Sequence, residues 1–162
     1  MDDQSGMKFW VDAGHVARRT LDAVRPELQA GKSWVEIIDF AERFIRRNGG
    51  QPAFPTTIAV NEIAAHFTPD HADKNLQGWE DEMVLQKGDL VKIDVGVHIN
   101  GHIGDNAMTV EIGNGNSHTE QIKAAKESRD AAIEKLHPGT PWHEVGAAAA
   151  QPSVDAGFQP IR

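Results

Sequence analysis

The stretch Lys92–Val110, KIDVGVHINGHIGDNAMTV, constrains the fold more than any other part of the chain. Asn100 and Gly101 form a dipeptide that strongly favours a two-residue type I′ turn, and many apolar residues flank it on both sides. The stretch is therefore predicted to be a β-hairpin that runs from about Leu90 to Val110.

The predicted turn also fixes the register of two acidic residues. A two-residue turn at this dipeptide makes the numbers of paired residues add up to 201, so Asp94 lies opposite Ala107, and Asp105 opposite Gly96. Because side chains alternate between the two faces of a strand, both carboxylates project from one face as diagonal neighbours, about 7 to 8 Å apart by backbone. The other face of the first strand is apolar and is expected to join the core: Val91, Ile93, Val95, Val97 and Ile99.

Two carboxylates on one partly buried face repel each other and lose hydration, so a cation that holds both would stabilise the pair. At this separation Asp94 and Asp105 can converge on one divalent ion or bridge two ions about 3.5 to 4 Å apart. The alternative is a structural ion pair with Lys92, which projects from the same face. Since one lysine cannot neutralise two acids, a metal site is the preferred interpretation.

The rest of the chain is predicted to be mainly helical, which makes the fold class α/β or α+β. Trp10 and Ala13 are placed on the buried stripe of the first helix, and Phe44 on that of the second. Ser33 and Glu36 are predicted to form a capping box. The expected elements are helices at about 5–28 and 34–48, a strand at 56–60, a helix at about 119–136 and another that opens near 140.

A shift of 108 residues superimposes part of the sequence on itself without a gap. Eleven of the 36 positions from 17 to 52 are identical to their shifted counterparts, including the pair Trp34 and Trp142. Shared Gly and Pro punctuation could produce part of this match, but paired tryptophans are hard to obtain that way. We interpret the pattern as an internal duplication, with a first repeat at about 8–112 and the start of a second at about 117–162.

Composition excludes several classes of function. The chain has 24 acidic residues, 16 lysines and arginines and a formal net charge of −8, so no nucleic-acid-binding face is predicted. It has no cysteine, which excludes disulfides and thiolate chemistry. It has neither a signal-like start nor an apolar run that could span a membrane, so a cytoplasmic location without a membrane partner is expected.

The segment GGQPAFPTTIAVNEIAAHFTP, from Gly49 to Pro69, and the hairpin together resemble the methionine aminopeptidases, most closely the archaeal and eukaryotic type II branch. The family pattern is AFP, then NEIAAH-aromatic-TP, then KID-small-G and an aspartate eleven residues after the first. The resemblance implies the pita-bread fold, in which two pseudo-symmetric αβ halves enclose a dinuclear metal site. It also implies metal-dependent removal of N-terminal methionine from peptides and nascent chains, with the ribosome as a candidate partner.

The resemblance assigns roles to four residues. Asp94 would be a bidentate ligand of one metal ion, and Asp105 would bridge both ions. His66 matches the histidine that contacts the substrate near the scissile bond, and Phe54 matches a wall of the pocket for the methionine side chain. The implied cofactors are two divalent ions, and an oxygen-rich site suits Co, Mn, Fe or Zn. Among the other histidines, His98 is expected to lie nearest to the metals because it shares the aspartate face.

The sequence also departs from the family pattern. The family supplies a histidine and two glutamates as further ligands from its second half, so the chain is expected to be the N-terminal portion of a longer protein and inactive alone. His66 and Asp94 are 28 residues apart. That is about eight more than the family pattern, which predicts a surface loop at about 70–83.

Two other functions stay open at this stage. A pita-bread binding module that has lost catalysis would have no need to keep acids facing each other on a buried face. A related proline-directed dipeptidase would share the two aspartates, although AFPTT and NEIAAHFTP favour methionine.

Overall fold

The computed structural model describes residues 3–69, 83–113 and 115–160, so residues 70–82 of the expected surface loop lie outside the described part. The chain forms two compact units, Met1–Gly115 and Asn116–Arg162. In the described part, no helix is both long and apolar enough to cross a membrane.

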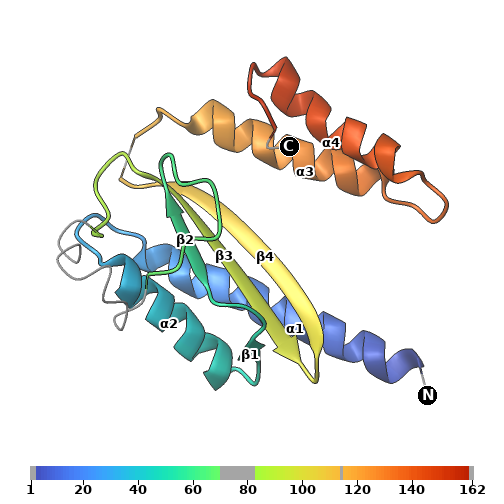
Figure 1. Ribbon diagram of the computed structural model, residues 1–162, viewed down its shortest axis with the longest axis horizontal. Coiled ribbons are helices and arrows are strands. Elements are labelled where there is room, and N and C mark those ends of the chain that lie inside the picture. Colours follow the sequence, from blue (N-terminus) through green and yellow to red (C-terminus); the bar gives the residue numbers. More distant parts are fainter. Residues whose placement is uncertain (1–2, 70–82, 114, 161–162) are drawn as a thin grey trace. The chain divides into compact units, whose positions relative to one another are not determined.

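The first unit contains an antiparallel sheet built around one long strand, β3 (Leu90–Ile99), as Figure 1 shows. Along one edge β3 pairs over its whole length with β4 (His102–Glu111). Two shorter strands, β2 (Thr57–Val60) and β1 (Gln51–Pro52), pair with β3 near its beginning and its end respectively. The predicted hairpin is therefore the framework of the sheet.

The turn of the hairpin has the predicted geometry. Asn100 and Gly101 have φ values of 51° and 80°, both in the left-handed region that a type I′ turn requires. Ile99 pairs with His102 across the turn. The expected register is thereby confirmed along the whole ladder.

Two helices, α1 (Asp3–Val24) and α2 (Trp34–Arg47), pack against the sheet, and a short 3-10 turn at Arg25–Glu27 follows α1 (Figure 1). The approach is close, since a Cβ atom at Gly104 of β4 would lie 2.5 Å from the backbone nitrogen of Gly14 in α1. The alternating apolar side chains of β3 face these helices and form the core with them: Val16, Ala17, Leu21, Val24, Ile37, Ile38, Ala41, Ile45, Val91, Ile93, Val95 and Val97.

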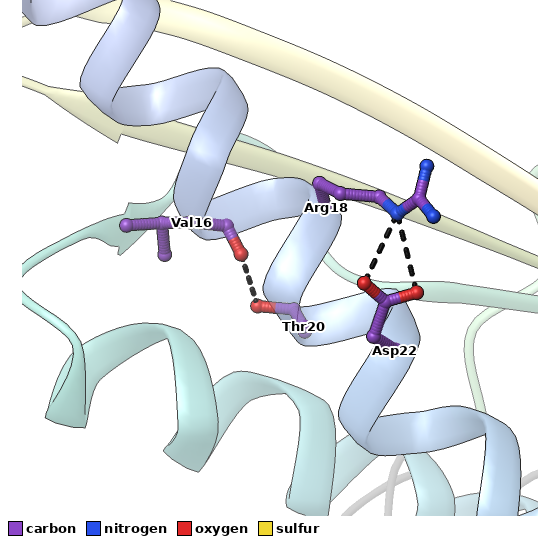
Figure 2. Close-up of polar contacts among 4 residues, drawn as sticks. All are labelled: Val16, Arg18, Thr20 and Asp22. Atoms are coloured by element: carbon purple, nitrogen blue, oxygen red, sulfur yellow. Dashed lines mark hydrogen bonds and ion pairs between the residues drawn. The ribbon is translucent and has the colours of Figure 1, made fainter.

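Helix α1 has a buried and an exposed side, which Figure 2 compares. The buried Thr20 donates its hydroxyl hydrogen to the carbonyl oxygen of Val16 at 2.8 Å, so its polar atom enters the core satisfied. On the exposed side, the Nε of Arg18 donates to both carboxylate oxygens of Asp22, at 3.2 and 3.1 Å. The buried side therefore adds to the core, whereas the exposed ion pair contributes little to stability.

Some details of the helices differ from the sequence-based expectation. Trp10 is 52% exposed, because its ring packs edge-on against the imidazole of His102 at the hairpin tip and not in the core. Ser33 occupies the N-cap position of α2, but its side chain makes no capping hydrogen bond. The amide of Trp34 donates to the carbonyl oxygen of Met83 at 2.9 Å, so a neighbouring segment satisfies one amide of the first turn. Phe44 is only half-buried.

The second unit contains two helices, α3 (Thr119–Lys135) and α4 (Trp142–Asp155). Helices α2 and α4 both have 14 residues and begin 108 positions apart. The glycines before and after them also match in φ: 89° at Gly31 and 90° at Gly139, and 85° at Gly49 and 82° at Gly157. The repeated sequence thus has a repeated backbone geometry.

Burial differs between the matched positions of the two units. Leu28 is 8% exposed, whereas its counterpart Leu136 is 53% exposed. Trp34 is partly buried against the core of the first unit, whereas Trp142 is 78% exposed. In the first unit a sheet covers the helix pair; in the second unit, the described residues form only helices, which leave these apolar side chains uncovered.

Candidate metal centre

Asp94 and Asp105 lie on the face of the hairpin that points away from the core. In the observed register Asp94 pairs with Ala107, and Asp105 pairs with Gly96, as predicted. The two acids are therefore diagonal neighbours on adjacent strands. Asp94 is half-buried, whereas Asp105 is exposed.

The surroundings of Asp94 are unfavourable for an isolated carboxylate. Its Oδ1 atom is buried and has no hydrogen-bond partner. Burial raises the pKa of Asp94, and the negative charge of Asp105 and a hydrogen bond with its carboxyl group raise it further, while the charge of His66 acts in the opposite direction. A cation between the two acids would offset both the loss of hydration at Asp94 and its repulsion from Asp105.

Lys92 does not take that place. Its Nζ donates to the carbonyl oxygen of Asn61 at 2.9 Å. Burial lowers the pKa of Lys92, and the nearby Glu62 acts against this shift. The alternative of a structural ion pair between Lys92 and the aspartates is thus not supported. The all-oxygen donor set and the unpartnered Oδ1 atom of Asp94 fit a divalent metal ion.

Phe54 lies against the same strand as Asp94. A Cβ atom at Gly96 would lie 2.5 Å from Cδ1 and 2.7 Å from Cζ of the Phe54 ring. Since Gly96 is the cross-strand partner of Asp105, the ring is placed beside the carboxylate pair. Sequence reasoning did not single out Gly96, although a glycine inside a strand often marks a close approach of this kind.

Backbone contacts on both sides of Phe54 hold the segment that carries it. The amide of Ala53 donates to the carbonyl oxygen of Gly96 at 2.9 Å. The amide of Thr56 donates to Oε1 of Glu42 in α2 at 3.4 Å. The position of the ring therefore depends on both β3 and α2.

His66 is exposed and lies in the segment that follows β2. Its φ of 62° is in the left-handed region, which is uncommon for a histidine. Its charge acts on Asp94, so the structure brings it within electrostatic reach of the pair. His98 shares the aspartate face and is a diagonal neighbour of Asp105, and its buried Nδ1 has no hydrogen-bond partner.

The described residues supply two carboxylates to the candidate site. They include no group of three or more His, Cys, Asp or Glu side chains arranged to hold a metal ion. The candidate metal ligands in this part of the chain are thus Asp94 and Asp105.

Comparison with known proteins gives a consistent result. The sequence model of metallopeptidase family M24 matches residues 10–162. A methionine aminopeptidase of Archaeoglobus fulgidus is 38% identical over 161 residues, which are 99% of this chain and 51% of that protein. The chain spans about half the length of this relative and of the similar Thermococcus proteins.

Solved structures confirm the predicted fold. A methionine aminopeptidase of Thermotoga maritima matches with a TM-score of 0.86 and 24% identity, over 100% of this chain and 64% of that one. A prolidase of Pyrococcus furiosus matches with a TM-score of 0.78 and 25% identity, over 94% of this chain and 43% of that one. The chain therefore has the pita-bread fold and covers about half of such a domain.

Proposed function

The chain belongs to metallopeptidase family M24, and on this basis we propose that the complete protein is a metal-dependent aminopeptidase that removes N-terminal methionine. The observation that carries the proposal is the pair Asp94 and Asp105, which shares one face of the hairpin and has a buried oxygen without a partner. The name of the Archaeoglobus relative supports methionine as the residue removed.

Finer parts of the proposal rest on the motifs. We place the protein in the type II branch because AFP and NEIAAHFTP occur in the order of that branch. Its substrates would be peptides and nascent chains, met in the cytoplasm and in part at the ribosome. The chain spans about half the length of these relatives, which supports its interpretation as a portion of the enzyme, and we propose that this portion is N-terminal.

Each candidate residue has a defined task in this proposal. Asp94 and Asp105 would hold two divalent ions, drawn from Co, Mn, Fe or Zn. When bound, such ions lower the pKa of a coordinated water toward neutrality and polarise a carbonyl group. Phe54 would form a wall for the methionine side chain, and His66 would contact the substrate near the scissile bond.

The remaining ligands, a histidine and two glutamates, would come from the second half of the domain. Two exposed apolar side chains, Leu136 just after α3 and Trp142 in α4, support this view, because their matched residues in the first unit are covered. We therefore expect no release of methionine by residues 1–162 alone. Turnover by this chain without any further polypeptide would contradict the proposed division of the site.

The decisive experiment uses the complete protein with Met-Ala-x and x-Pro peptides. We expect cleavage of the methionyl peptide, dependent on a divalent ion and lost in Asp94→Asn and Asp105→Asn. Asp22→Asn, which alters an exposed acid on α1, is the matched control and should keep activity. Preference for x-Pro peptides would instead favour the proline-directed dipeptidase. Failure to cleave either peptide, with or without a divalent ion, would favour a binding module.

A further inference from the structure

The segment from Asn61 to Thr68 leaves β2, carries His66 and returns to the same strand. Asn61 and His66 both adopt left-handed φ values, of 52° and 62°. For a residue other than glycine this conformation costs about 1 to 2 kcal/mol, and asparagine tolerates it better than histidine. Contacts at the ends of the segment must therefore hold His66 in place.

Asn61 makes contacts at every polar group it has. Its amide donates to the carbonyl oxygen of Leu90, and its Oδ1 accepts from the amide of Leu90, both at 2.9 Å. Its Nδ2 donates to Oδ1 of Asp89, and its carbonyl oxygen accepts from Nζ of Lys92, again at 2.9 Å. Three of these hydrogen bonds go to the beginning of β3, the strand that bears Asp94, and the fourth goes to Asp89 just before it.

The other end of the segment is tied to β2 and α2. The amide of Ile58 donates to the carbonyl oxygen of Phe67 at 2.9 Å, and the hydroxyl of Thr68 donates to the carbonyl oxygen of Thr56 at 3.1 Å. The Phe67 ring also packs edge-on against Trp34, with centroids 6.0 Å apart. His66 is thus the residue just before a fixed end.

We propose that Asn61 is a positioning residue, which fixes the segment that presents His66 to the carboxylate pair on β3 and β4. Asn61 touches neither the candidate metal ligands nor His66 in the described contacts; it acts through the backbone of the segment. Because Leu90 and Lys92 belong to the strand of Asp94, the same strand determines where Asp94 and the start of the segment lie. The effect of Asn61 on catalysis rests on the proposed function, but its effect on His66 does not.

The first test measures motion of His66 in the 162-residue chain by ¹⁵N relaxation. In Asn61→Gly the left-handed φ stays accessible, both side-chain hydrogen bonds are lost, and the backbone at position 61 gains conformational freedom. Asn100→Gly is the matched control, since it replaces the other asparagine with a positive φ in the described part of the chain, and Gly-Gly also suits a type I′ turn. We expect the backbone order parameter of His66 to fall from about 0.85 to below about 0.6 in Asn61→Gly only. An unchanged value would overturn the proposal.

Thr68→Val provides a second variant, in case Asn61→Gly fails to fold. It removes one donor at the opposite end of the segment and keeps the side-chain shape. We expect a smaller fall of the same order parameter. If His66 stayed ordered in this variant too, the hydrogen bonds at the ends would not be what holds it.

The second test is a double-mutant cycle in the complete enzyme. We expect Asn61→Gly to lower kcat/KM on a methionyl peptide about tenfold or more in the wild type, and to have almost no effect in a His66→Ala background. A purely structural role would give the same loss in both backgrounds and would overturn the positioning role. A wild-type enzyme without this activity would refute the proposed function, while the relaxation experiment would still decide the role of Asn61.

Discussion

The aromatic ring of Phe54 fills the space beside Gly96 in which any other residue would carry its Cβ atom. This contact joins the segment between β1 and β2 to the strand of Asp94, on the face that carries the two acids. A single glycine thereby allows a large apolar side chain to lie next to the candidate metal centre.

Replacing this glycine should displace the ring. We expect Gly96→Ala to reduce the free energy of unfolding of the 162-residue chain by about 1 to 3 kcal/mol, as measured by urea denaturation, because the new methyl group overlaps Phe54. In a Phe54→Ala background the same change should cost little. Gly14→Ala in α1, where a Cβ meets nothing within 4 Å, should instead stabilise the chain by about 0.5 to 1 kcal/mol. Equal losses from Gly96→Ala in both backgrounds would contradict the overlap.

The charge of Asp94 should weaken the metal-free chain as the pH rises. Its pKa is raised in the folded state, so the folded chain binds this proton more tightly than the unfolded chain does. The resulting stabilisation is present at acid pH, below the ordinary pKa, and is lost as the pH rises through the raised value. We expect Asp94→Asn to gain up to about 1 kcal/mol over the wild type between about pH 4 and pH 7, a small gain because the side chain is partly solvated.

Urea denaturation of both proteins across this pH range measures the difference, which removes the contribution of other acids. Asp22→Asn controls for the loss of one negative charge. If the wild type instead gained stability relative to Asp94→Asn as the pH rose, the pKa of Asp94 would be lowered and not raised in the folded chain.

A divalent ion bound by the two aspartates should offset the loss of stability that the charge of Asp94 causes. We expect Mn²⁺ or Co²⁺ to raise the Tm of the 162-residue chain by about 1 to 2 °C when the free ion equals its dissociation constant. Asp94→Asn and Asp105→Asn should lose this shift, whereas Asp22→Asn should keep it. A shift that persists in both hairpin variants would place the ion elsewhere.

The two matched tryptophans should differ in their contribution to stability. Trp34→Ala should cost about 3 kcal/mol, because the indole packs against the core and against Phe67. Trp142→Ala should change the free energy of unfolding of the 162-residue chain by no more than about 0.5 kcal/mol, because the Trp142 side chain is 78% exposed. Urea denaturation of both variants tests this, and a large loss from Trp142→Ala would mean that the indole is covered in solution.

Much of the fold was predictable because the decisive signals are local. Asn100 and Gly101 specify a turn without help from distant residues, and the pleat then assigns every hairpin side chain to a face. Helix periodicity and the glycines at Gly31 and Gly49 act over a few residues as well. These features depend on residues close in the sequence and not on how the rest of the chain is arranged.

Other expectations were wrong because they concern partners far away in the sequence. Ser33 has the residue type of a cap, but its side chain makes no capping hydrogen bond, and the adjacent Trp34 amide donates to the carbonyl oxygen of Met83. Trp10 has helical spacing, but α1 presents it to His102 at the hairpin tip. Residue type and spacing do not reveal which distant segment packs beside a given residue.

The sequence by itself determined that Asp94 and Asp105 share a face, because register follows from a two-residue turn and a period of two. Only the tertiary structure decided that Oδ1 of Asp94 is buried without a partner, that Phe54 covers Gly96 and that Asn61 ties the segment of His66 to β3. The same holds for the two helix pairs with matching sequence, in which Leu28 is buried in one unit and its counterpart Leu136 is exposed in the other. Burial depends on which elements pack together, and that is a property of the assembled fold and not of any short stretch of chain.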